Sequence, residues 1–322
     1  PQSESFEAGH WVAVSSDNRP DVVVAQIVAI DVNEMSLELT EDVSGFDGDD
    51  GIAVRRLTTY LTQPYFPADE DPPFGDTFDP ALLAGQTHLA YLDVWRRHVT
   101  AIEDPHFREV ALGGPDTATR VQTVWALRIL RTDGEPVDAS QIGCADELDE
   151  WTALTAPAAG RMSARAAAAP DVDDPCAIQP DAGYRGLENR LYRVEIHDSG
   201  DLGDATFKWS RDNGSILSSI VDFPDVDEVE VHSLGKDNVL RFNAGNRVEV
   251  LSDESELAGL AGTMASIDGA PDEAERRITL DTDVSAYETH TRPRIRRWDH
   301  DGAEIATGPG PIELEKGVQV EF

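Results

Sequence analysis

Lysine is almost absent from this chain of 322 residues, which has only Lys208, Lys236 and Lys316 among its 26 basic residues. The 62 acidic residues leave a formal net charge of -36 at pH 7. We expect neither nucleic acid nor an anionic membrane surface as a partner, because phosphate contacts need clustered Lys and Arg. Disorder is not expected either, because 40% of the residues are hydrophobic and strand-like runs are present. This acid-coated, lysine-poor composition resembles that of proteins from extreme halophiles.

Long hydrophobic runs are also missing. No apolar segment approaches the roughly 20 residues needed to span a bilayer, so we expect no membrane insertion. The sequence begins without an initiator Met or a basic and apolar leader, so we expect a processed or partial chain whose start does not indicate a localisation.

Cysteine occurs only at Cys144 and Cys176, which lie 32 positions apart. This pair permits a disulfide, which would stabilise the fold by about 3 kcal/mol, and it equally permits two thiols. Two cysteines do not make a zinc site alone, and no His stands at finger-like spacing beside them. We therefore expect no metal and no cofactor.

Familiar catalytic motifs are absent as well: there is no GxSxG elbow, no HExxH, no Walker sequence and no dinucleotide fingerprint. The stretch Gly113-Gly114-Pro115 lacks the Lys-Ser/Thr of a phosphate-binding loop, which favours a turn. The acidic stretch FDGDDG (Asp47, Asp49, Asp50) lacks the ligand spacing and closing Glu of a calcium loop. It therefore indicates a solvated acidic loop.

Two weaker chemical possibilities stay open. A pair of carboxylates for glycoside cleavage would be sought first among Glu188, Glu195 and Asp198. A sugar-binding groove would be lined by Trp95, Trp125 and Trp209, although their apolar surroundings favour core packing. The histidines are scattered, and His98 and His197 fit strand surfaces better than catalytic bases.

An internal repeat joins the two ends of the chain. Near the start stand AGHWVAVSSD, QIVAID, SLELTEDVS and VRRL, and near the end AGNRVEVLSD, TMASID, RITLDTDVS and IRRW. The blocks recur in the same order, and each alternates apolar and polar positions, as in a strand with one buried face. We expect two copies of one small antiparallel β-barrel or sandwich module.

The chain is therefore predicted to be mainly β, with duplicated modules flanking a central antiparallel β domain that has long irregular loops. Long strands are expected at 87–102 and 119–130, and a short helix near 146–154 whose Leu148, Trp151 and Leu154 cover one face of a sheet. The expected division is a first module at 1–57, an extended linker at 58–86, a central domain at 87–240 with an irregular insertion at 131–182, and a second module with a C-terminal strand at 241–322.

The stretch FKWSRDNGSI (residues 207–216) contains the strongest local signal. Apolar-rich runs flank Asp212-Asn213-Gly214, and Asn-Gly meets the positive φ angles of a two-residue hairpin turn at the least steric cost. We expect a hairpin turn at Asp212, Asn213 and Gly214. Because hairpin tips are exposed, Arg211 and Asp212 are candidates for contact with a partner.

Three long blocks carry a family resemblance: YLDVWRRHVTAIEDPHFREVALGGPDTATR, GYRGLENRLYRVEIHD and ATFKWSRDNGSI. With VRRL and IRRWD, they resemble a bacterial and archaeal domain-of-unknown-function family whose genes tend to lie beside phage-tail-like clusters, including contractile injection systems. Members of that family carry a further segment at each end, and neither flank stands in this sequence. The family offers no catalytic residues to transfer.

The resemblance implies a non-enzymatic structural or assembly protein at the baseplate, fibre or surface-binding end of a phage-tail-like particle. Its expected partners are other subunits, a homo-oligomer of itself, and a cell-surface glycan or receptor. It would be assembled in the cytoplasm of a halophilic host and act in a virion-like or extracellular particle. The alternative is a carbohydrate-binding or carbohydrate-cleaving component of such a particle.

Overall fold

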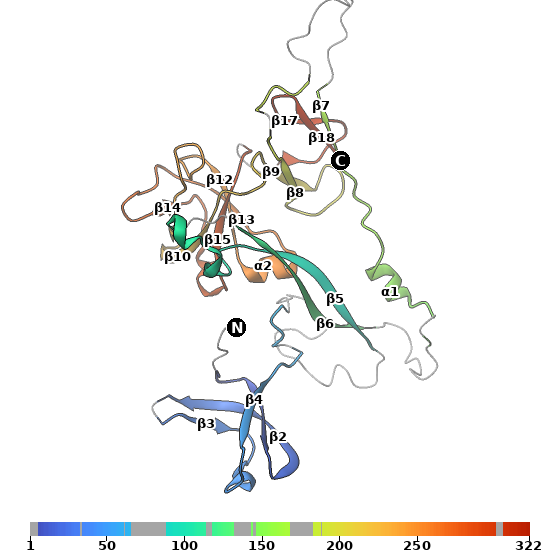
Figure 1. Ribbon diagram of the computed structural model, residues 1–322. Coiled ribbons are helices and arrows are strands. Elements are labelled where there is room, and N and C mark those ends of the chain that lie inside the picture. The colour runs from blue at the N-terminus through green and yellow to red at the C-terminus, as the bar shows by residue number, and fades with distance from the viewer. Residues whose placement is uncertain are drawn as a thin grey trace, which may run out of the picture. The chain divides into compact units, whose positions relative to one another are not determined.

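The computed structural model confirms a mainly β protein built from several antiparallel sheets (Figure 1). It describes residues 6–32, 34–60, 62–65, 88–113, 118–131, 143, 146–167, 183–187, 189–300 and 305–322. The described chain forms two compact units: β1 to β4 belong to the first unit, and β7 to β18 belong to the second. No helix of these described residues is long and apolar enough to cross a membrane.

The first unit is built on a four-stranded sheet in the order β3-β2-β1-β4. Its strands are β1 (Trp11–Ser16), β2 (Arg19–Asp31), β3 (Ser36–Leu39) and β4 (Ala53–Leu57). Every second residue of β1 and β2 points to the same side, as the alternating sequence predicts. The buried residues of this side and of the adjoining 3-10 helix η1 (Ser44–Phe46) are Val12, Val14, Ala25, Ile27 and Phe46.

A long two-stranded ribbon consists of β5 (His88–Val99) and β6 (Arg120–Arg131). These are the two long strands that the sequence predicts, each with a central Trp. The connection between them includes the 3-10 helices η3 (Pro105–Phe107) and η4 (Val110–Leu112). Gly113 ends η4 with a positive φ of 85°, the usual role of glycine at a helix end, while residues 114 and 115 lie outside the described residues.

The second unit contains a six-stranded sheet in the order β13-β12-β15-β10-β11-β14. Its strands are β10 (Leu217–Asp225), β11 (Glu228–Val231), β12 (Arg247–Leu251), β13 (Thr263–Ser266), β14 (Arg277–Thr279) and β15 (Arg294–Trp298). The two ends of the sheet also meet, because Asp268 N–H donates to Thr279 O at 2.9 Å and Asp281 N–H donates to Ser266 O at 3.0 Å. The sheet thus curls around an apolar core that includes Val248, Val250, Ile278, Leu280 and Ile295.

Two three-stranded sheets complete the second unit, in the orders β16-β9-β8 and β17-β18-β7. Their strands are β7 (Ser163–Ala166), β8 (Arg193–Ile196), β9 (Thr206–Ser210), β16 (Ile305–Ala306), β17 (Ile312–Glu315) and β18 (Val318–Glu321). A second, smaller core of Phe207, Trp209 and Val320 lies between them. The remaining helices are α1 (Asp149–Leu154), α2 (Asp253–Ala258) and the 3-10 helix η6 (Ser285–Thr289).

Matched hydrogen bonds show that the two repeat copies, residues 8–57 and 244–298, share one architecture. In both copies the glycine of the first block donates to an isoleucine in the second strand or directly after it, and the strand that ends the copy pairs with the first strand in the same register. The corresponding bonds are Gly9 N–H to Ile27 O (2.7 Å) and Gly245 N–H to Ile267 O (2.8 Å). The corresponding pairs are Val14 with Val54 and Val250 with Ile295. The repeat predicted from the sequence is therefore a structural duplication.

For the block QIVAID, the structural equivalence with TMASID differs from the alignment of the letters. Aligning QIVAID with TMASID by letter places Ile30 against Ile267. In the structure Ile27 takes the place of Ile267, because Ile27 N–H donates to His10 O just as Ile267 N–H donates to Asn246 O. The alignment of this block was therefore wrong by three residues, because hydrogen-bond register decides equivalence.

Three other expectations need correction. The range 87–240 is not a separate domain, because β10 and β11 lie within it and complete the sheet of the second copy. The insertion at 131–182 is not wholly irregular, because β7 pairs with β18. Helix α1 does not cover a sheet face with its apolar side chains, since Trp151 and Leu154 are 37% and 49% exposed. Most of the predicted linker at 58–86 lies outside the described residues.

Candidate functional site

The segment FKWSRDNGSI leads from β9 through a tight turn into β10. Asn213 and Gly214 have φ angles of 57° and 63°, and Asp212 C=O accepts a hydrogen bond from Ser215 N–H at 3.1 Å. The flanking strands do not pair with each other: β9 pairs with β8 and β16, whereas β10 pairs with β11 and β15. The predicted hairpin is therefore wrong. The tight turn instead carries the chain from one sheet to another.

Ion pairs hold Arg211 and Asp212, the two residues directly before the Asn213-Gly214 turn. Arg190 binds the carboxylate of Asp212 through a charge-assisted hydrogen bond. Arg211 lies 3.6 Å from Asp299 and 3.3 Å from Glu315. The Arg211 side chain still has 35% of its surface exposed. The residues proposed for partner contact thus have neighbours within the chain, and Arg211 remains accessible.

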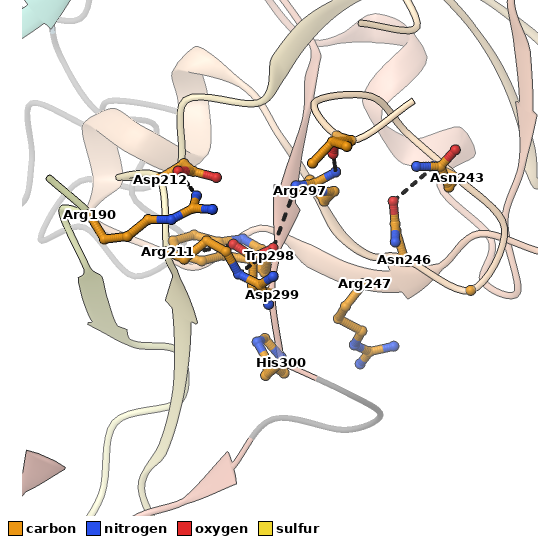
Figure 2. Close-up of a pocket in the computed structure, with 12 residues that line it drawn as sticks. Arg190, Arg211, Asp212, Asn243, Asn246, Arg247, Arg297, Trp298, Asp299 and His300 are labelled. Carbon is orange, nitrogen blue, oxygen red and sulfur yellow. Dashed lines mark hydrogen bonds and ion pairs between the residues drawn. The ribbon is translucent and has the colours of Figure 1, made fainter. Parts of the chain in front are cut away.

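Arg211 and Asp212 line a pocket of about 260 Å³ in the second unit (Figure 2). Figure 2 shows the side chains of Arg190, Arg211 and Asp212 on one side and those of Asn243, Asn246 and Arg247 on the other. Arg297, Trp298 and Asp299, at the end of β15, lie between these groups. Three of the blocks that carry the family resemblance therefore meet here, contributing Arg190, Arg211 and Arg297.

The charge of the lining differs from that of the whole chain. Four arginines (Arg190, Arg211, Arg247, Arg297) face two aspartates (Asp212, Asp299), a surplus of two positive charges, in a chain with a net charge of -36. The Arg297 guanidinium donates to two backbone carbonyl oxygens, Val239 O at 2.8 Å and Arg241 O at 2.7 Å. Arg297 is therefore fixed in place as part of the wall.

The guanidinium of Arg297 is buried near charges of both signs. Burial is the main effect that lowers the pKa of Arg297; the Asp299 carboxylate opposes it, and the nearby Arg211 cation, a smaller effect than Asp299, lowers the pKa further.

Behind the pocket wall, a buried ion pair joins two sheets. Lys208 on β9 donates to Glu249 on β12 at 2.5 Å, and both side chains are 3% exposed. Trp298 Nε1–H donates to the other oxygen of Glu249 at 2.9 Å, and the Lys208 ammonium lies 5.0 Å from the Trp298 ring centroid. Because the group is enclosed, it holds the sheets together and is not accessible to a substrate.

The electrostatics of Glu249 depend on this lysine. Burial acts to raise the pKa of Glu249, but the charge and hydrogen bond of Lys208, with the hydrogen bond from Gly262 N–H, outweigh it and hold the pKa below its ordinary value. Glu249 is therefore ionised in the folded protein at neutral pH.

The other carboxylates singled out from the sequence have separate roles. Glu195 pairs with Arg193 and lies 3.8 Å from Lys208. Asp198 accepts a hydrogen bond from the Thr206 hydroxyl at 2.8 Å. Glu188 lies outside the described residues. The structure thus gives Glu195 and Asp198 different partners on the β8–β9 sheet.

In the acidic loop of the first unit, the side chain of Arg19 pairs with Asp49. Asp49 accepts hydrogen bonds from Arg19 Nε at 2.7 Å and from the Ser16 hydroxyl at 2.8 Å. The part of the chain that the structure describes contains no group of three or more His, Cys, Asp or Glu side chains arranged to hold a metal ion. Cys144 and Cys176 both lie outside that part, so their oxidation stays an open prediction.

The three tryptophans proposed for a groove differ in burial. Trp209 is 4% exposed and belongs to the smaller core with Phe207, so it does not present a sugar-binding face. Trp125 on β6 is 59% exposed, and Trp95 on β5 contacts Tyr65 edge-to-face with 6.5 Å between ring centroids. Only Trp125 offers an open ring surface among these three.

Sequence reasoning did not identify most of the pocket. Asn246 and Arg247 stand in the block AGNRVEVLSD, and Arg297 stands in IRRW, both of which indicated only a repeat. The available signal was a difference between the copies, since Arg247 occupies the place that Trp11 takes in the first copy. Their convergence with Arg211 depends on the packing of β9 beside β15.

The chain matches a family of unknown function, DUF6519, over residues 43–169 and 140–322. No curated protein and no solved structure matches it. Because the matched residues cover most of the sequence, the chain belongs to the DUF6519 family of unknown function.

Proposed function

We propose that this protein is a non-enzymatic structural or assembly component of a phage-tail-like particle from a halophile, at the baseplate, fibre or surface-binding end. Its localisation would be a virion-like or extracellular particle assembled in the cytoplasm. The blocks YLDVW, GYRGLEN and FKWSRDNGS support the particle context through their resemblance to proteins encoded in such gene clusters. The acidic, lysine-poor composition supports the halophilic host.

The observation that carries the assembly role is the incompleteness of the first repeat copy. In the second copy, β10 and β11 lie between β15 and β14 and complete the curled sheet. In the first copy the equivalent strands, β4 and β3, are the two ends of the sheet, and no described strand pairs with their outer edges. Such edges present unpaired backbone groups to another chain.

Side-chain burial differs between the copies in the same way. Val54 on β4 is 39% exposed, whereas its counterpart in the second copy, Ile295, is 0% exposed against the core. On the outer side of the sheet, Val24 is 47% exposed, whereas its counterpart Met264 is 9% exposed. The first copy thus leaves apolar surface open that the second copy covers, as expected for a surface buried by a neighbouring subunit.

Substitution at the open edge tests this proposal. Val54→Glu places a charge on a half-exposed side chain, so the chain should fold as before but lose association with its own copies or with particle subunits. Val110→Glu is the control, because Val110 is 87% exposed on η4 and takes no part in the sheet. Sedimentation velocity and co-purification with the particle report association, and circular dichroism reports folding. A wild-type chain that stays strictly monomeric and joins no particle would contradict the proposal.

A further inference from the structure

We propose that the pocket lined by Arg190, Arg211, Arg247 and Arg297 binds a tetrahedral oxyanion that carries two charges, such as a phosphate or sulfate group. This binding site goes beyond the assembly role and does not depend on it. Its chemistry follows from the charge, donors and size of the pocket.

Charge is the first argument. The lining arginines exceed the lining aspartates by two in a chain that is otherwise strongly anionic. Carboxylates outside the lining offset part of this surplus, because Glu315 lies 3.3 Å from Arg211 and the charge of Arg247 acts on Asp281, and an anion in the pocket would add to that compensation. The structure holds the arginine cluster in place with Arg190 bound to Asp212 and Arg297 bound to two carbonyl oxygens. The cations therefore stay together without a ligand to gather them.

Donor capacity is the second argument. A guanidinium carries five N–H donors in a fixed fork that fits oxyanions. Among the described residues, the Arg211 side chain makes ion contacts with Asp299 and Glu315 and stacks over Trp209, with 5.8 Å from its guanidinium carbon to the ring centroid. Its Nε lies 3.6 Å from Asp299, beyond hydrogen-bond length. Arg211 therefore keeps donors for a bound anion.

Size and direction are the third argument. A volume of about 260 Å³ admits a small group and is below the range of pockets that enclose drug-sized ligands. Arg190 and Arg211 approach from one side, and Arg247 and Asn246 from the other (Figure 2). Donors from several directions suit the oxygens of a tetrahedral anion, whereas a carboxylate presents two oxygens in one plane. The pocket therefore favours a phosphate or sulfate group over a carboxylate.

Glu315 supplies a matched pair of tests. It lies 3.3 Å from Arg211 and competes with an anion for that guanidinium, and it also accepts the Tyr192 hydroxyl at 2.8 Å. Arg211→Gln removes a cation and should weaken binding about tenfold. Glu315→Gln keeps an acceptor for Tyr192, removes the competing charge and should tighten binding about threefold. Opposite signs from the two variants, with the larger effect at Arg211, are expected if the anion binds beside Arg211.

The probes are inorganic phosphate, inorganic sulfate and acetate, titrated into the full chain by isothermal titration calorimetry at constant ionic strength. Calorimetry is preferred to melting temperature because sulfate and phosphate stabilise proteins nonspecifically. Arg276→Gln is the control, since Arg276 is 49% exposed and pairs with Glu230 away from the pocket. Saturable binding of phosphate or sulfate that responds to Arg211→Gln and Glu315→Gln supports the site, and the preferred ion distinguishes the two sources. Equal binding of acetate overturns the doubly charged specificity. No binding, or equal binding by wild type and Arg211→Gln, overturns the site.

Discussion

Replacing Lys208 with methionine tests how far the buried ion pair stabilises the second unit. Methionine fills a similar volume without charge, so the substitution leaves Glu249 ionised and 3% exposed beside an apolar side chain. Trp298 Nε1–H and Gly262 N–H continue to donate to the Glu249 carboxylate at 2.9 Å each. The substitution therefore removes the cation that joins β9 to β12, together with its weaker contacts with Glu195 and the Trp298 ring.

The expected loss of stability in Lys208→Met follows from the burial of the ion pair. Removing one partner of a buried ion pair costs about 3–5 kcal/mol, because an uncompensated charge remains in a medium of low polarity. The two retained hydrogen bonds place the expected loss for Lys208→Met at the lower end, about 3 kcal/mol of the free energy of unfolding at pH 7. Adding Glu249→Gln removes the second charge and keeps an acceptor for Trp298. The double variant should therefore recover most of the loss.

The pH dependence gives a second signature. In wild type the pKa of Glu249 lies below its ordinary value, so its contribution is present above the unfolded-state pKa and is lost as pH falls through the folded-state pKa. In Lys208→Met, burial is no longer outweighed by the lysine and should raise the pKa of Glu249. That variant then loses stability as pH rises. The difference between the two proteins should grow from about pH 4 to pH 7.

Urea unfolding at constant high salt, followed by circular dichroism at pH 4.5, 6 and 7.5, measures this difference. Two further ionisable groups face the pair: Glu195, 3.8 Å from Lys208, and His197, whose Nδ1 lies 3.5 Å from Lys208 Nζ. Lys236→Met is the control, because Lys236 is exposed, and it should change stability by less than about 0.5 kcal/mol. A loss below about 1 kcal/mol for Lys208→Met, or one that does not change with pH, would refute the reasoning.

Two further predictions concern the turn and the surface charge. Gly214→Ala should destabilise the protein by about 1–2 kcal/mol, because φ is 63° at this position and an added Cβ would lie 3.2 Å from Arg296 Cδ. Chemical unfolding measures the change in the free energy of unfolding. An unchanged free energy would contradict the prediction and show that the turn relaxes. Removing salt should unfold the chain, because the repulsion among its acidic residues is then screened less; the screening length rises to about 10 Å at 0.1 M salt. Circular dichroism measured as KCl is lowered from about 3 M to about 0.1 M follows the loss of structure. An unchanged spectrum would argue against a halophile-type protein.

Much of the β architecture was predictable because it depends on local chemistry. The alternation of Val12 and Val14 in the first copy and of Val248 and Val250 in the second predicted strands with one buried face, and all four side chains are at most 3% exposed. The order of the blocks predicted the duplication. These features follow from the two-residue period of a strand, which can be seen in the sequence of a single segment.

Which strands pair with each other was harder to predict from the sequence. Asn213-Gly214 identified a tight turn, because positive φ is a property of those residues. Which strand lies beside β9 or β10 depends on contacts with β8, β15 and β16, which are distant in sequence. The same limit explains the three-residue offset between Ile30 and Ile27, since similar letters fit either alignment and only the hydrogen bonds with His10 select one.

The sequence by itself determined the fold class, the two repeat copies, the acidic surface and the position of the Asn213-Gly214 turn. Tertiary structure alone decided that β10 and β11 complete one copy while the other stays open, and that Arg190, Arg211, Arg247 and Arg297 line one pocket. The physical reason is that backbone preference and hydrophobic period act over a few residues, whereas the meeting of charged side chains is set by the packing of whole sheets.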